Sequence, residues 1–252
     1  MIIAHLIYDI QALKACSLTC YTWYTAATPH LHRTFVFKEA GPGQDRGGLK
    51  PLSKRHALGL LPLVKDVQIQ QSCTQPRWFL PRSFSRRKLR YFSAFTNVQS
   101  LTLQQLDIHT FIPGVERYFG HFSPTLRSIT LESPRCTPRQ LSYFLSLFTN
   151  LDNIEIRSFM HFKTRVPDNP LPALSTPKLR GQLSLSSFTA VDTWEDLAAS
   201  CGLRFRCIHL YPVSKCAPIL LSACAETLEV LRIEPNNETG EGPRLDSIAS
   251  WG

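Results

Sequence analysis

The chain has 252 residues, of which 43% are hydrophobic and 19% are charged, and its formal net charge is +9 at pH 7. This composition excludes a disordered chain, and no apolar run has the length of a membrane-spanning helix, so a globular protein of one or two domains is expected. The positive charge suits either a nucleic acid or an acidic protein surface as a partner.

Residues 1–37 predict a small helical head. The N-terminus is apolar but lacks the basic start and the cleavage site of a signal peptide, which predicts a cytoplasmic or nuclear protein with reduced cysteines. Two stripes of apolar residues at helical spacing follow, and the second is expected to end before Pro29. The stripes consist of Ile3, Leu6, Ile7 and Ile10, and then of Leu13, Cys16, Cys20 and Trp23.

Residues 38–54 are expected to form a flexible linker. The linker is rich in glycine but lacks the Gly-Lys-Ser/Thr ending of a phosphate-binding loop, so no nucleotide cofactor is expected.

One short motif recurs along residues 55–235. Its pattern is apolar, two others, apolar, one other, apolar, and a copy with one extra residue lies at 179–185. The second and third apolar residues are two apart, which places them on one face of a strand. Most steps between copies fall within the ~20–29 residues of a leucine-rich repeat. The regular copies begin at Val64, Val98, Leu126, Leu151, Phe205 and Leu228.

Apolar stripes of helical period precede most of these predicted strands. A single strand–helix unit cannot bury its apolar face alone, whereas stacked units form a continuous core. The predicted fold class is therefore α/β: a helical head followed by an irregular leucine-rich-repeat-like solenoid with a curved parallel sheet. The stripes are Ala57, Leu60, Leu61 and Val64; Val115, Tyr118, Phe119 and Phe122; Leu141, Phe144, Leu145 and Phe148; Trp194, Leu197, Ala198 and Cys201; and Ala217, Leu220, Leu221 and Cys224.

Two features depart from a regular repeat. The asparagine that usually follows a leucine-rich-repeat strand is replaced in most copies, for example by Leu106 and Pro134, so the repeats are irregular. Prolines crowd residues 160–178, which are expected to form an irregular insertion, and residues 236–252 are expected to be a frayed tail.

The head resembles the F-box motif, especially its fungal version. The resemblance lies in Cys16-Ser-Leu-Thr-Cys20 followed by Trp23, and in the Pro29-x-Leu-x-Arg33 segment that leads to a first strand. It implies docking on a Skp-type adaptor of a cullin-RING ubiquitin ligase, while the repeats hold a target protein. Ile3, Leu6, Leu13, Leu18 and Trp23 are the candidate adaptor contacts or supports.

The F-box motif normally opens with Leu-Pro, and this sequence begins after that point. We therefore expect a fragment, an incomplete gene model or a degenerate member with weakened adaptor binding. The alternative interpretation of the head is a helical hairpin that caps the open end of a solenoid.

A row of mostly polar residues is expected to point away from the core. Such a row suits an extended protein surface better than a small molecule, although a merely solvated face is the alternative. We expect Glu155, Arg157, His209, Tyr211 and Arg232 to form the centre of the target-binding surface. The whole row is Gln68, Gln70, Thr102, Gln104, Thr130, Glu132, Glu155, Arg157, Ser184, Ser186, His209, Tyr211, Arg232 and Glu234.

Other function classes have less support in the sequence. No catalytic motif is found, so neither an enzyme nor a cofactor is expected. The C-terminal cysteines match no zinc-ligand spacing and are interpreted as small buried hydrophobes, so no metal is expected. Residues 77–92 interleave basic and aromatic side chains, which makes nucleic-acid binding or a non-ligase scaffold the alternative function.

Overall fold

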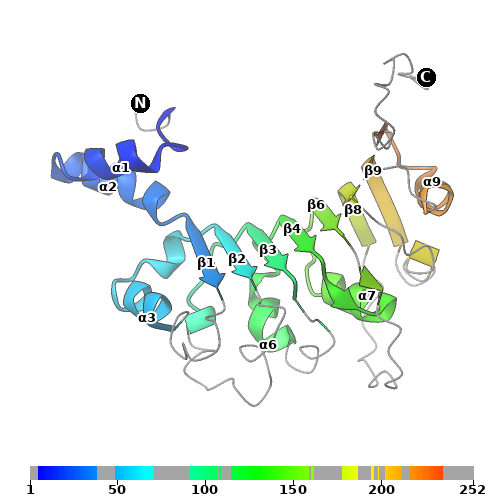
Figure 1. The fold of residues 1–252 in the computed structure, drawn as a ribbon, viewed down its shortest axis with the longest axis horizontal. Coiled ribbons are helices and arrows are strands. Elements are labelled where there is room, and N and C mark those ends of the chain that lie inside the picture. The colour runs from blue at the N-terminus through cyan, green and yellow to red at the C-terminus, as the bar shows by residue number, and fades with distance from the viewer. Residues whose placement is uncertain are drawn as a thin grey trace.

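The structure is a computed structural model, and it describes residues 5–38, 49–70, 91–106, 108, 115–158, 160–161, 178–186, 194–195, 198, 202–211 and 216–234. The fold is α/β, with an eight-stranded parallel sheet whose strands follow the order of the chain (Figure 1). The strands are β1 (Thr34–Lys38), β2 (Asp66–Gln70), β3 (Ser100–Gln104), β4 (Ser128–Glu132), β6 (Asn153–Arg157), β8 (Lys178–Ser186), β9 (Gly202–Tyr211) and β10 (Val230–Ile233). A second sheet pairs β5 (Arg135–Cys136) with β7 (Met160–His161) in parallel.

The predicted α/β class and the parallel pairing of the repeated segments are confirmed. The apolar residues of neighbouring strands stand in register, so that Leu101 lies between Val67 and Ile129. The first strand, β1, begins directly after Arg33, where the resemblance implied a strand, although it does not match the repeated motif and its first residues fall inside the expected helical head. Its Phe35 and Phe37 are nevertheless buried in the main core, in register with β2.

The same hydrogen-bond pattern links neighbouring strands at their N-terminal ends. The carbonyl of Arg33 accepts hydrogen bonds from the amides of Lys65 and Asp66, at 2.8 and 3.0 Å. The carbonyl of Lys65 in turn accepts from Gln99 and Ser100, at 2.7 and 3.0 Å. The contact recurs between β3 and β4 and between β4 and β6, so one backbone geometry is repeated along the sheet.

A second repeated contact lies where the strands end. Gln105, Ser133 and Ser158 each follow the last residue of a strand and have positive φ angles of 56°, 49° and 51°. Each amide donates to the carbonyl of the last residue of the next strand, at 2.7 to 2.9 Å. The next residue in two of these turns, Leu106 or Pro134, is buried, so an apolar residue preceded by a left-handed one stands where asparagine was expected.

The copy at 179–185 changes the register of the sheet. The pairing of β8 with β9 shifts between Gly181 and Gln182, which leaves Arg206 of β9 as the extra residue. Gly181 has a φ of +88°, and a Cβ atom there would lie 2.1 Å from the carbonyl oxygen of Asp152, the residue just before β6. A glycine is therefore required where β8 passes this carbonyl.

The main core lies between the sheet and the helices, which Figure 1 shows on one side of it. Five phenylalanine rings continue across the core from β1, with centroids 5.3 Å apart for Phe37 and Phe92, 6.3 Å for Phe92 and Phe119, 6.0 Å for Phe119 and Phe144, and 5.3 Å for Phe144 and Phe148. The helices and single turns are α3 (Leu49–Ala57), η2 (Leu61–Leu63), α6 (Val115–Phe119), η5 (Gly120–Phe122), α7 (Pro138–Ser146) and α9 (Ala217–Cys224).

The apolar helical stripe predicted for residues 57–64 is only partly confirmed. Leu61 and Val64 are buried, but Ala57 is exposed, because α3 ends there. Gly59 adopts a φ of +65°, and the amide of Leu60 donates to the carbonyl of Arg55 at 2.9 Å. These two features are typical of a helix that ends at a glycine. Residues 49–54, expected in the linker, belong to α3, while residues 39–48 lie outside the described residues.

We expect His121 to make the stability of the protein depend on pH. Burial lowers its pKa, although a backbone hydrogen bond with Phe92 opposes the shift, and its Nε2 is buried without a partner in the described structure. A histidine with a lowered pKa in the folded state takes up its proton mainly on unfolding. The contribution of the neutral His121 to the free energy of unfolding is therefore complete above the unfolded pKa of about 6.5. It is lost as the pH falls through the folded pKa.

We expect the melting temperature to fall between pH 7.5 and pH 5. Burial also lowers the pKa of His32, with help from Arg55, and this residue contributes in the same direction. His121→Phe keeps a ring beside Phe122 and removes the titrating group, so its melting temperature should depend less on pH than that of the wild type. A slope as steep as that of the wild type would contradict the role of His121.

The head consists of α1 (Ile10–Ser17) and α2 (Tyr21–Leu31), which pack on each other at the β1 end of the sheet (Figure 1). The Asp9 carboxylate caps α1 by accepting from the amides of Gln11 and Ala12, at 3.0 and 2.9 Å. Leu13 and Ala27 form a small core separate from the main one, and the partly buried Leu6, Trp23, Ala26 and Leu31 surround it.

Three details predicted for the head are wrong. The first stripe is not on one helix, because Leu6 and Ile7 lie before α1, which begins only at Ile10. The stripe from Leu13 to Trp23 is broken, because α1 ends at Ser17 and α2 begins at Tyr21, and this leaves Cys20 exposed. Helix α2 also continues through Pro29 instead of ending before it. Pro29 has no amide hydrogen, so it leaves the carbonyl of Thr25 without that helical bond, and the helix ends two residues later.

Two further predictions concern segments that are described in part or not at all. Of the expected insertion at 160–178, residues 160–161 form β7 and Lys178 begins β8, and the residues between lie outside the described ranges. The expected tail at 236–252 also lies outside them. None of the helices in the described ranges combines the length and the apolar character needed to cross a bilayer.

Candidate functional site

The face of the sheet opposite the helices carries the predicted polar row. The strand register aligns its residues in two lines, one through Thr130, Glu155 and Ser184 and the other through Glu132, Arg157 and Ser186. We call this surface the polar face. Its first line comprises Gln68, Thr102, Thr130, Glu155, Ser184, His209 and Arg232, and its second comprises Gln70, Gln104, Glu132, Arg157, Ser186 and Tyr211.

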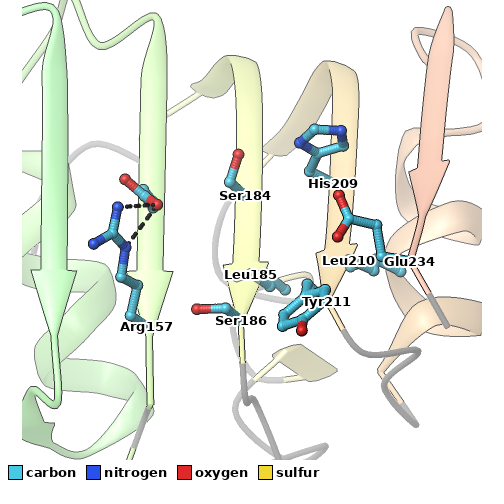
Figure 2. A pocket seen from close by; sticks show the side chains of 9 residues that line it. Arg157, Ser184, Leu185, Ser186, His209, Leu210, Tyr211 and Glu234 are labelled. Carbon is cyan, nitrogen blue, oxygen red and sulfur yellow. Dashed lines mark hydrogen bonds and ion pairs between the residues drawn. The ribbon is translucent and has the colours of Figure 1, made fainter. Parts of the chain in front are cut away.

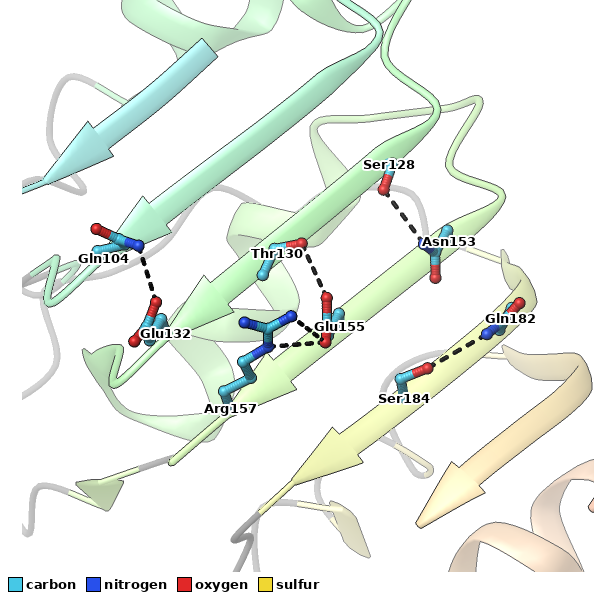
Figure 3. A network of polar contacts seen from close by, with 9 residues as sticks. All are labelled: Gln104, Ser128, Thr130, Glu132, Asn153, Glu155, Arg157, Gln182 and Ser184. Carbon is cyan, nitrogen blue, oxygen red and sulfur yellow. Dashed lines mark hydrogen bonds and ion pairs between the residues drawn. The ribbon is translucent and has the colours of Figure 1, made fainter. Parts of the chain in front are cut away.

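Hydrogen bonds cross the strands on this face (Figure 3). The Gln104 side-chain amide donates to the Glu132 carboxylate at 2.9 Å. The Thr130 hydroxyl donates to Oε2 of Glu155 at 3.2 Å, while the Arg157 guanidinium donates to Oε1 of Glu155 at 2.7 Å. The Arg157–Glu155 pair lies within β6, and together with the two cross-strand bonds it holds the middle of the polar face in one arrangement before any partner binds.

The C-terminal half of the polar face contains a shallow hollow of about 290 Å³ (Figure 2). Ser184 and Ser186 of β8 are smaller than the residues beside them on β6 and β9, and this difference in size forms the depression. The residues that line the hollow are Glu155, Arg157, Ser184, Leu185, Ser186, His209, Leu210, Tyr211 and Glu234.

Four of the five residues predicted as the centre of the target-binding surface line this hollow. They are Glu155, Arg157, His209 and Tyr211, which come from β6 and β9. The fifth, Arg232, pairs in register with His209 on β10 and does not line the hollow.

The predicted centre left out three residues of its own row that also line the hollow: Ser184, Ser186 and Glu234. The sequence did contain an indication of this hollow. One copy of the motif has two small residues at positions where the copies before and after it have larger ones, and such a difference in size leaves space on a sheet.

The predicted adaptor residues occupy different environments in the head. Leu13 is buried, whereas Leu6 and Trp23 are partly buried around it, so these three support the head. Leu18 is 86% exposed, and Ile3 lies outside the described residues. Of the five candidates, Leu18 is therefore the one that the structure places at the surface of the head.

Four further exposed residues of the head were missed as candidate contacts. Tyr8 and Tyr21 are 93% and 80% exposed, and Ile10 and Tyr24 are 58% and 50% exposed. Ile10 was predicted to lie on an apolar helical stripe, but it is the first residue of α1 and faces solvent. The spacing i, i+3 of the two tyrosines of α2 was the signal in the sequence, because it puts them on one side of a helix.

The segment proposed for nucleic-acid binding is described only at its end. Tyr91 and Phe92 are buried in the main core, and the rest of residues 77–92 lies outside the described ranges. Among the C-terminal cysteines, Cys216 and Cys224 are buried, and burial raises the pKa of the Cys224 thiol. In the described ranges no group of three or more His, Cys, Asp or Glu side chains is placed to hold a metal ion.

No family model, curated protein or solved structure matches this chain. Two surfaces therefore remain as the basis for a functional inference. One is the exposed apolar surface of the head, and the other is the polar face with its hollow.

Proposed function

We propose that this chain is an F-box-type substrate receptor built on a leucine-rich-repeat-like solenoid. In this proposal the head docks on a Skp-type adaptor of a cullin-RING ubiquitin ligase. The polar face of the repeats then holds a target protein.

The solenoid part of the proposal is supported by the two repeated contacts of the sheet. A carbonyl that accepts two amides recurs at the strand starts, and a left-handed residue that donates to the next strand recurs at the strand ends. Strand order equals chain order, so each strand lies beside those of the preceding and following units. Stacked repeats have this property, since each unit buries its apolar face against its neighbours.

The exposed apolar surface of the head is the observation that carries the adaptor part. Tyr8, Ile10, Leu18, Tyr21 and Tyr24 are all at least half exposed, although the head has a core of its own. Leaving large apolar side chains in water forgoes the free energy of their burial, and a concentration of them marks an interaction surface. An adaptor that covers them would recover that free energy.

The proposal predicts that Leu18→Lys combined with Tyr21→Asp weakens capture of a purified Skp-type adaptor at least about tenfold. Both positions are exposed, and each new charge suits its helix end, since Leu18 caps the C-terminus of α1 and Tyr21 begins α2. The head should therefore stay folded, which circular dichroism can verify.

The matched control is Leu58→Lys, which replaces an equally apolar residue, 61% exposed, in the repeat region. It should capture the adaptor as well as the wild type does. If the double variant also captures the adaptor normally, or if the wild type captures none, the docking proposal is wrong.

A further inference from the structure

The hollow of the polar face has the dimensions of a socket for a side chain. Its volume of about 290 Å³ lies just below the ~300–1,000 Å³ typical of small-molecule pockets. Its floor is formed by the two serines of β8, while longer residues of β6 and β9 stand on either side (Figure 2). A single protruding side chain of a partner fits such a depression better than a complete cofactor does.

The charges at the hollow are not balanced. Arg157 binds Glu155 at 2.7 Å, so these two charges compensate each other, and the second Glu155 oxygen accepts from Thr130. Glu234 also lines the hollow, and within the described part of the chain no ion pair or side-chain hydrogen bond engages its carboxylate. With histidine counted as neutral, the lining residues therefore leave one uncompensated negative charge.

An aromatic ring stands on the same wall as this carboxylate. Tyr211 is 48% exposed and comes from β9, and Glu234 follows β10, the next strand of the sheet. An aromatic face beside a carboxylate favours a cation, which gains from both groups. An anion in the hollow would instead meet the carboxylates of Glu155 and Glu234.

We infer that the hollow receives a lysine or arginine side chain of the target protein. The cationic end binds the Glu234 carboxylate, and the aliphatic stem lies along the Tyr211 ring. This inference rests on the proposed function, in which the polar face holds the target, and it names the chemistry of that target.

The test uses four probe peptides, Ac-Gly-Ala-X-Ala-Gly-NH2, in which X is lysine, arginine, glutamine or glutamate. Each is titrated into the isotope-labelled chain of residues 1–252, and the backbone amide signals of Ser184, Ser186 and Tyr211 are followed by NMR. The lysine and arginine peptides should shift these signals, and the glutamine and glutamate peptides should not. The formal charge of +9 repels a basic probe overall, so a localised response reports this site.

Two variants then identify the residues responsible. Glu234→Gln combined with Tyr211→Leu should weaken binding of the lysine peptide about fivefold or more, since it removes the charge and the ring together. The control is Glu132→Gln, which removes a carboxylate of the same face that lies outside the hollow and already binds Gln104. It should bind the lysine peptide as the wild type does.

Equal responses to the lysine and glutamine peptides, or unchanged binding by the double variant, would overturn the inference. The readout is independent of adaptor capture, which depends on the head. A chain that captures the adaptor but does not discriminate among the peptides would refute the socket alone. A chain that discriminates but captures no adaptor would refute the ligase proposal and leave a cation-binding surface.

Discussion

Gly181→Ala should lower the free energy of unfolding by about 3 kcal/mol or more. The φ of +88° at this position is unfavourable for alanine, and the new methyl group would lie 2.1 Å from the carbonyl oxygen of Asp152. Both atoms in this clash are held by the backbone, because the same carbonyl accepts from the amide of Gln182 at 2.8 Å. The sheet can relieve the clash only by separating β6 from β8.

Gly59→Ala is the matched control for this prediction. Gly59 also has a positive φ, of +65°, but a Cβ atom there would meet nothing within 4 Å. Its replacement should cost only about 1 kcal/mol, which is the penalty of the left-handed conformation. Urea denaturation of both variants separates the conformational penalty from the clash, and equal losses in the two would show that the close approach to Asp152 is absent.

Phe119→Ala should lower the free energy of unfolding by about 3–5 kcal/mol. The Phe119 side chain is fully buried, and its ring contacts those of Phe92, Phe122 and Phe144, with centroids 6.3, 5.9 and 6.0 Å away. These partners come from three successive units, so a cavity at this point weakens the core between all of them.

Phe119→Leu serves as the control, because it keeps most of the apolar volume and removes the aromatic contacts. It should cost clearly less than the alanine variant does, and thermal unfolding of the two measures the difference. If alanine and leucine are equally destabilising, the loss comes from the ring contacts and not from a cavity.

The periodic part of the fold could be predicted from the sequence because burial and periodicity coincide there. The apolar pairs such as Leu101 and Leu103 lie two apart, and both are buried in the parallel sheet as expected. Strand β1 could not be predicted in this way, because Phe35 and Phe37 complete the same core without the motif before them. The end of α3 depends on Gly59, whose left-handed conformation is a local property that periodicity does not report.

The candidate site could be predicted only in outline. Alternation along a strand places Glu155 and His209 on one face, and the register then brings both to the rim of the hollow. The hollow itself depends on side chains of unequal size on three neighbouring strands. The residue pattern within one strand gives no information about the sizes of the side chains beside it. In the head, helical spacing identified apolar residues, but it did not separate the buried Leu13 from the exposed Leu18.

The strand order has a consequence for how the chain folds. Each pairing in the main sheet joins residues that are close in sequence, from 23 apart between Cys207 and Val230 to 34 apart between Asp66 and Ser100. Closing such short loops costs little chain entropy compared with pairing the two ends of a protein. We expect the sheet to nucleate where two neighbouring units are best packed and to grow outward one strand at a time, so that its first and last strands protect their amides least from hydrogen exchange.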